Sequence, residues 1–174
     1  MILTGPEITS RVRDGRIRIE PFDASHAQPN SYDFHLGETV GSYTSHVLDC
    51  ARDNPFEQHP IPPDGFELQP HRIYLAATQE RIGSDLVVPV IRARSSIARL
   101  GLFVHVTADL IDLGSFGQLT LQLHAVQPVR IYPGMLIGQV TFWETTGERV
   151  LYDGKYQGSR GPQPSKSHLD FEVR

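Results

Sequence analysis

Short apolar runs separated by glycine and proline recur along most of the chain, and this pattern predicts a fold built mainly from β-strands. A strand-like run at residues 32–36 comes first. Seven further runs predict strands at residues 66–68, 73–77, 86–93, 103–107, 119–123, 129–131 and 136–143. This many short strands joined by polar turns indicates a distorted β-barrel or a jelly-roll-like sandwich.

Strict alternation is clearest at residues 119–124, where three leucines alternate with Thr120, Gln122 and His124. Because successive side chains of a strand point to opposite faces, the leucines should face a core and the polar residues should face away from it. Polar side chains in this arrangement either form the solvent face of a half-buried strand or line a binding site.

Other segments depart from the strand pattern. Pro6 suits a first helical turn and Gly15 a helix end, so a short helix is expected between them. Residues 55–65 hold four prolines and predict a surface loop. Residues 152–174 are polar and glycine-rich, and they predict either disorder or a C-terminal flap.

Composition sets limits on the classes of function. A chain of 174 residues predicts one domain, residues 1–174, and a net charge of −4 argues against a general nucleic-acid binder. The single cysteine, Cys50, forms no internal disulfide and suits a reducing compartment. The chain shows neither a signal-peptide pattern nor an apolar run long enough to span a membrane, so we expect a cytoplasmic protein with no membrane partner.

Three arginines and two serines lie close together in residues 92–99, at the end of the expected strand at residues 86–93 and directly after it. Guanidinium groups make bidentate contacts to phosphate oxygens, and serine hydroxyls complete such a cradle. A solvated turn with surface arginines is the alternative interpretation. The candidate phosphate-binding residues are Arg94, Ser95, Ser96 and Arg99.

Three more segments carry candidate chemistry. Asp112 precedes a glycine turn, where a carboxylate either orients a water molecule and a sugar hydroxyl or simply caps the loop. Residues 120–124, with residues 133–139 downstream, could line a base pocket. Lys155 and its neighbouring glycines could close over a triphosphate as a lid.

Some nucleotide sites are excluded by missing motifs. A zinc deaminase needs two cysteines beside a His-x-Glu motif, and this chain has one cysteine. Neither the P-loop nor the dinucleotide-binding glycine motif occurs. The eight histidines are scattered, so a histidine metal site is not expected.

Together these segments resemble the dCTP deaminase and dUTPase superfamily, and the dCTP deaminase family above all. The resemblance covers nearly the whole chain in five collinear stretches: residues 28–33 (QPNSYD), 94–102 (RSSIARLGL), 111–117 (IDLGSFG), 133–139 (PGMLIGQ) and a last one formed by residues 155–158 (KYQG) and 161–165 (GPQPS).

The resemblance implies a dUTPase-type fold that assembles as a homotrimer, with sites between subunits and Mg²⁺ held through the triphosphate. Residues 94–99 would hold phosphates and Asp112 would contact the sugar or position the attacking water. Residues 152–174 would form the lid over the nucleotide. The remaining carried-over contacts are Thr120, Leu121 and Gln122 toward the base, Gln139 and Tyr152 around the pocket, and Lys155 on the phosphates.

Two positions depart from the family pattern. Deaminases carry a proton-shuttling glutamate where this chain has Gln122, and an amide neither accepts nor delivers a proton near pH 7. His124 lies on the same strand face and is a remote candidate for that role. Ser159 stands where many members have a glutamine.

Three functions remain open. The first is hydrolysis of dUTP to dUMP and pyrophosphate by Asp112 and Mg²⁺, with some action on dCTP. The second is a dCTP deaminase, including a bifunctional one, in which Gln122 replaces the catalytic glutamate. The third is a nucleotide sensor without turnover. The sequence does not decide the preferred base, the origin of Gln122 or inhibition by dTTP.

Overall fold

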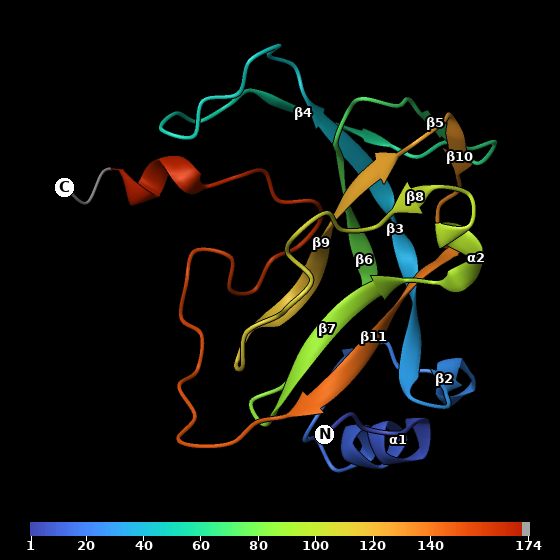
Figure 1. The fold of residues 1–174 in the computed structure, drawn as a ribbon, viewed down its shortest axis with the longest axis vertical. Helices are drawn as coiled ribbons and strands as arrows, with labels where there is room; N and C mark the ends of the chain where they lie inside the picture. Colours follow the sequence, from blue (N-terminus) through green and yellow to red (C-terminus); the bar gives the residue numbers. More distant parts are fainter. Residues whose placement is uncertain (172–174) are drawn as a thin grey trace.

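Strand β3 (Ser31–Tyr43) is the centre of a nine-stranded, barrel-like sheet in the computed structural model, which describes residues 1–171. Neighbouring strands are antiparallel. The main path runs in the order β7 (Val87–Ala93), β11 (Leu136–Glu144), β3, β6 (Tyr74–Gly83), β9 (Phe116–Ala125) and β8 (Leu102–Phe103). Figure 1 shows how these strands curve around a common interior, which confirms the mainly β, barrel-like fold that the sequence predicts.

Shorter elements complete the fold. Strand β1 (Arg18–Glu20) pairs with β6, while β2 (Ala27–Gln28) and β4 (Phe56–Pro60) pair with β3. A separate two-stranded sheet joins β5 (Phe66–Leu68) to β10 (Val129–Ile131). The helical elements are α1 (Gly5–Arg13), η1 (Ala24–His26), α2 (Ser95–Ala98) and η2 (Ser167–Asp170). In the described residues, none of the helices has both the length and the apolar character required to cross a membrane.

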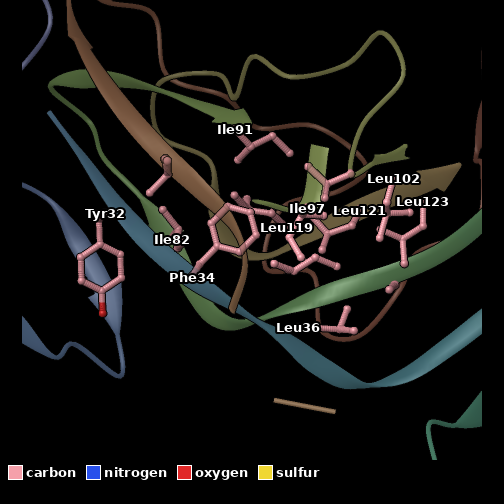
Figure 2. Packing of buried hydrophobic residues seen from close by; sticks show 14 of the residues in the cluster. Tyr32, Phe34, Leu36, Ile82, Ile91, Ile97, Leu102, Leu119, Leu121 and Leu123 are labelled. Carbon is pink, nitrogen blue, oxygen red and sulfur yellow. The ribbon is translucent and has the colours of Figure 1, made fainter. Parts of the chain in front are cut away.

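The core lies inside the curved sheet, as Figure 2 shows for residues from several strands. Strand β9 alternates buried and partly exposed positions along its whole length, so the predicted alternation is confirmed. Leu121 and Leu123 are fully buried beside Phe34 and Phe142. Burying one such side chain contributes about 1.5–3 kcal/mol, so the alternation of β9 fixes which of its faces remains available for a ligand.

Strand β3 changes partners along its length. Residues 32–35 pair with β11, and residues 39–43 pair with β4, with a register irregularity between Leu36 and Val40. Thr78 of β6 supports the matching irregularity by accepting a hydrogen bond from Leu119 N (2.9 Å) and donating one to Glu80 O (2.6 Å). These bends let one long strand join the two halves of the barrel.

Several element boundaries differ from the sequence predictions. Helix α1 starts beside Pro6 as expected. Residues 55–65 are not entirely loop, because β4 (Phe56–Pro60) forms there on an edge with mostly exposed side chains. The proline-rich sequence does not predict this strand, which forms because it pairs with the second half of β3. The strand expected at residues 103–107 is reduced to β8 (Leu102–Phe103).

The C-terminal segment is ordered against the barrel. Figure 1 shows it leaving β11, looping outward and returning toward β9. We refer to residues 152–171 as the tail. Gln118 N donates to Ser159 O at 2.9 Å, and Gly161 N donates to Gln118 Oε1 at 2.7 Å. The sequence allows either disorder or a flap for this segment, and the tail is ordered against β9 as a flap would be. Residues 172–174 of the predicted lid lie outside the described residues.

Candidate functional site

A cavity of about 670 Å³ lies between the outer face of β9, the loop that precedes β9 and the tail. Its volume is in the range of small-ligand sites, and its wall is mostly apolar with several amide and hydroxyl groups. Among residues 1–171, no Asp, Glu, His, Lys or Arg lines it. The lining residues are Tyr43, Leu48, Ile73, Leu75, Val106, Thr107, Ala108, Leu110, Ile111, Ser115, Gly117, Gln118, Leu119, Thr120, Gln122, Tyr156, Ser159, Gln163 and Ser165.

Strand β9 contributes its polar face to this cavity. Thr120 and Gln122 both line the cavity, as the sequence predicts for a base-contacting pair. Gln122 N donates to Val104 O at 2.9 Å, which holds the strand against the preceding loop. The Leu121 side chain is fully buried in the core, so the contact with the nucleotide predicted for this residue stays a prediction that could involve only its main chain. The reason is the two-residue period of the strand, which turns Leu121 away from the face that carries Thr120.

Asp112 lies on the loop at the rim of the cavity. Its neighbours Ile111 and Ser115 line the cavity, whereas Asp112 itself is exposed and does not. The loop is fixed at both sides, because Ile111 N donates to Pro89 O and Gly114 N donates to Ser84 O, each at 2.9 Å. The carboxylate is therefore held on an anchored loop with access to solvent.

The tail closes one side of the cavity. Gln163 N donates to Thr120 Oγ1 at 3.1 Å, so the tail lies directly on the polar face of β9. Tyr152 anchors the start of the tail, since its N donates to Leu113 O at 2.7 Å and its hydroxyl accepts from Tyr156 N at 3.1 Å. Lys155 pairs with Asp170 at 2.6 Å and does not line the cavity.

The arginine segment, residues 92–99, lies elsewhere on the same chain. It runs from the end of β7 into α2 (Ser95–Ala98), where Ile97 is buried and the two serines are exposed. Arg99 ends the helix and is exposed as well. In the described residues none of this segment lines the cavity, so the structure groups the predicted phosphate-binding residues with one another and not with the predicted base-binding residues.

Arg94 is held by a buried carboxylate on β3, which is separated from β7 by β11. Its Nε lies 3.0 Å from Asp33 Oδ2, and the Asp33 side chain is only 4% exposed. Gln139 stands opposite Asp33 in the register of β11 with β3. Its amide accepts from Ser31 Oγ at 3.0 Å and donates to Ala93 O at 3.4 Å.

Opposing effects act on this carboxyl. Burial raises the pKa of Asp33, and the charge and hydrogen bond of Arg94, together with the charges of His26 and His35, lower it by less. The carboxylate therefore depends on its arginine partner, because transfer of a charged group from water into the protein interior is costly without one.

Some site residues were not predicted from the sequence. Tyr43, Leu48 and Ile73 reach the cavity from β3, from the loop after it and from the position just before β6. Their positions depend on long-range pairing, and no local signal marks them. Asp33 lies in residues 28–33, one of the stretches that resemble the family, and this motif could have marked it as a candidate site residue. His124 does not line the cavity, and its Nδ1 lies 3.3 Å from Arg72 O.

A protein-only metal cage is not built in residues 1–171, since no three His, Cys, Asp or Glu side chains gather there. Mg²⁺ in phosphate sites usually keeps several waters and is bound through one or two carboxylates and the phosphates of the substrate. The exposed carboxylate of Asp112 fits that donor chemistry.

The described residues thus form a β-rich barrel with a ligand-sized cavity and a separate arginine segment. The model of the dCTP deaminase-like family matches residues 2–145. This chain therefore belongs to the dCTP deaminase-like family.

Curated relatives match at nearly full length. A protein of Clostridium beijerinckii named "dCTP deaminase, dUMP-forming" is 42% identical over 173 residues, which is 99% of both chains. A "dCTP deaminase" of Rhodopirellula baltica is 44% identical over 98% of this chain and 86% of its own.

A solved structure supports the fold independently. The 2'-deoxycytidine 5'-triphosphate deaminase of Agrobacterium tumefaciens aligns with a TM-score of 0.65 and 20% identity. The alignment covers 83% of this chain and 48% of that one, so this chain spans about half the length of the solved protein. The similarity shows a shared fold.

Proposed function

We propose that this chain acts on pyrimidine deoxynucleoside triphosphates and converts dCTP to dUMP, ammonia and pyrophosphate. The observation that carries the proposal is the 42% identity, over nearly the entire chain, to relatives named as dUMP-forming dCTP deaminases. These names favour a bifunctional deaminase over the hydrolysis of dUTP alone, the first of the three functions considered from the sequence.

The proposed reaction combines two hydrolytic steps. Water adds at C4 of cytosine and ammonia leaves, and a second water attacks the α-phosphorus so that pyrophosphate leaves. Thr120 and Gln122 would contact the base within the cavity. Asp112, on its anchored loop, would contact the sugar and orient the water that attacks the phosphorus.

The phosphates would bind at the arginine segment. Arg94 and Arg99 supply guanidinium donors, and Ser95 and Ser96 present exposed hydroxyls beside them. Mg²⁺ bound through the triphosphate would neutralise charge that develops on the phosphate oxygens. Gln139, which touches the arginine segment at Ala93 O, would act from the wall of this region, and Tyr152 and Lys155 through the tail.

The separation of the cavity from the arginine segment supports a homotrimer with composite sites. A base held in the cavity of one subunit would then meet the arginine segment of another. We further propose a cytoplasmic location and, for the same site, dTTP as a competing ligand.

Hydrolysis of dUTP without deamination is the second candidate, and Gln122 favours it. An amide cannot carry protons between water, ring and leaving ammonia, and general acid–base help is worth roughly 10²- to 10⁴-fold. Because the cavity lining in residues 1–171 holds no carboxylate or imidazole, deamination at an ordinary rate requires a proton-transfer group from outside this lining.

The deciding experiment measures ammonia and pyrophosphate side by side from dCTP and from dUTP with Mg²⁺ present. Both products from dCTP support the first candidate, whereas pyrophosphate from dUTP without ammonia from dCTP supports the second. Tight binding without either product identifies a sensor. Gln122→Glu should create or raise ammonia release from dCTP, while Gln118→Glu, on the same face of β9, should not.

A further inference from the structure

The ion pair between Asp33 and Arg94 differs from the other arginine pairs around it. Arg92, two residues earlier, lies 3.3 Å from Asp109 Oδ2, but those side chains are 56% and 29% exposed. In the Asp33–Arg94 pair the corresponding values are 4% for the carboxylate and 34% for the arginine. Among the Asp–Arg and Glu–Arg ion pairs of residues 1–171, only Asp33–Arg94 combines a nearly dry carboxylate with an arginine whose side chain is partly exposed.

The backbone around Asp33 fixes its position. Asp33 lies opposite Gln139 in the β3–β11 ladder, and Gln139 lies opposite Arg92 in the β11–β7 ladder. The Gln139 side chain bonds to Ser31 on one neighbouring strand and to Ala93 on the other. Three adjacent strands are therefore tied together where β7 delivers Arg94, and the carboxylate has little freedom to move away.

The contact engages one edge of the guanidinium group. Asp33 takes the Nε side, and the ion pairs and side-chain hydrogen bonds of residues 1–171 include no partner for the two terminal nitrogens of Arg94. A guanidinium fork held at Nε still presents those nitrogens as bidentate donors. Its rotamer entropy is already lost before a ligand arrives, which favours binding.

We propose that Asp33 is a positioning residue that orients Arg94 for the phosphates of the nucleotide. Asp33 touches no reacting atom and acts only through Arg94. This inference rests on the proposed function, in which Arg94 binds phosphate. Because Asp33 is buried behind the guanidinium, it adds geometric order to the arginine without standing in the path of the ligand.

A double-mutant cycle tests the proposal. Binding of the non-hydrolysable α,β-imido analogues of dUTP and dCTP, and of deoxyuridine, is measured with Mg²⁺ for the unmodified chain, Asp33→Asn, Arg94→Ala and the double variant. We expect Asp33→Asn to weaken triphosphate binding about three- to tenfold, the range for immobilising one long side chain, with no further loss in the Arg94→Ala background. Deoxyuridine affinity should not change.

Two further variants separate positioning from folding. Asp85→Asn removes another Asp–Arg contact of 3.0 Å, to Arg18, and should leave triphosphate affinity unchanged. Arg94→Lys leaves Asp33 intact and keeps the positive charge, but it cannot engage Asp33 and a phosphate through one planar fork. We expect a loss similar to that of Asp33→Asn, and this variant decides the matter if Asp33→Asn does not fold.

Several outcomes would overturn the proposal. These are an equal effect of Asp33→Asn in both backgrounds, a parallel loss of deoxyuridine affinity, or Arg94→Lys binding as tightly as the unmodified chain. If the unmodified chain binds neither triphosphate analogue, the proposed function fails and this inference fails with it. If the unmodified chain binds the triphosphate analogues but the effects of Asp33→Asn and Arg94→Ala add, this inference fails and the proposed function stands.

Discussion

The main-chain nitrogen of Gln163 donates a hydrogen bond to Thr120 Oγ1 across 3.1 Å, and this contact joins the tail to the strand that forms the floor of the cavity. The bond uses the hydroxyl of a residue that also lines the cavity. A ligand that takes this hydroxyl as its own partner must displace the tail or share the oxygen with it.

Gly117→Ala should release the tail from β9. A Cβ atom at this position would lie 2.8 Å from both Ser159 N and Ser159 O, closer than real contacts allow. Losing one or two hydrogen bonds at about 1 kcal/mol each would raise the open population roughly tenfold. Limited proteolysis, with cleavage sites in the tail located by mass spectrometry, should show faster cutting there.

The control for this variant is Gly134→Ala. Open space surrounds a Cβ at position 134, but its φ of +68° makes alanine strained. The substitution should therefore lower stability without touching the tail. Equal cleavage of the tail in the two variants would mean that general destabilisation, and not the contact with Ser159, explains the effect.

Arg99→Ala should weaken triphosphate binding strongly and leave the fold intact. A charge-assisted contact is worth about 1.5–3 kcal/mol, so the affinity for a non-hydrolysable dUTP analogue should fall about 10- to 150-fold. Calorimetric titration measures this loss. Arg130→Ala, which removes another exposed arginine on β10, should show no change. Unchanged affinity in a folded Arg99→Ala variant would return Arg99 to the status of a surface residue.

Asp112→Asn should abolish pyrophosphate release while the nucleotide still binds. The amide keeps the size of the side chain but loses the negative charge that would orient the attacking water. Product formation and nucleotide affinity are measured on the same preparation. Asp109→Asn, on the same loop but paired with Arg92, serves as the control. Persistent pyrophosphate release from Asp112→Asn would remove this residue from the hydrolytic step.

The stability of the fold should depend on pH through Asp33. Burial raises its pKa above the ordinary value of 3.8, so the folded chain binds this proton more readily than the unfolded chain. The stabilising contribution of protonated Asp33 is complete below about 3.8 and is lost as pH rises through the raised pKa. An amide cannot ionise, so the Asp33→Asn variant should gain stability relative to the unmodified chain over that window.

Urea unfolding midpoints of the two proteins, measured from pH 3.5 to 7, give this difference, because titrating groups that do not interact with Asp33 cancel. His26 and His35 interact with Asp33, since their charges lower its pKa, so each is replaced by Gln in both proteins in a parallel series. The exposed pair of Asp85 with Arg18 supplies the comparison, and Asp85→Asn should not reproduce the effect. A stability difference that stays constant with pH would contradict the assignment of the raised pKa to burial of Asp33.

The alternation of apolar and polar residues and the positions of glycine predict those elements that depend on neighbouring residues in the sequence. The alternation in β9 separates core leucines from the polar face that carries Thr120 and Gln122, and the glycine after α1 marks the end of that helix. The same alternation buries the side chain of Leu121, a residue that the family resemblance places near the base.

Features that depend on distant partners were missed. Strand β4 forms because the second half of β3 supplies a pairing edge, and its own proline-containing sequence gives no such signal. Likewise, Asp33 and Arg94 are 61 positions apart, and only the strand order β7-β11-β3 brings them within contact. The division of the predicted site into a cavity and a separate arginine segment also depends on tertiary structure alone.

The tail is attached to more than β9, because Ser165 N donates to the Tyr43 hydroxyl and Ser167 Oγ donates to Cys50 O, each at 2.7 Å. Both acceptors belong to the β3–β4 hairpin. We therefore expect the hairpin and the tail to tolerate exchange between relatives only as a pair. In a chimera that received the tail of a relative without its hairpin, the tail would pack poorly against the barrel. Exchanging both segments together would preserve the wall of the cavity.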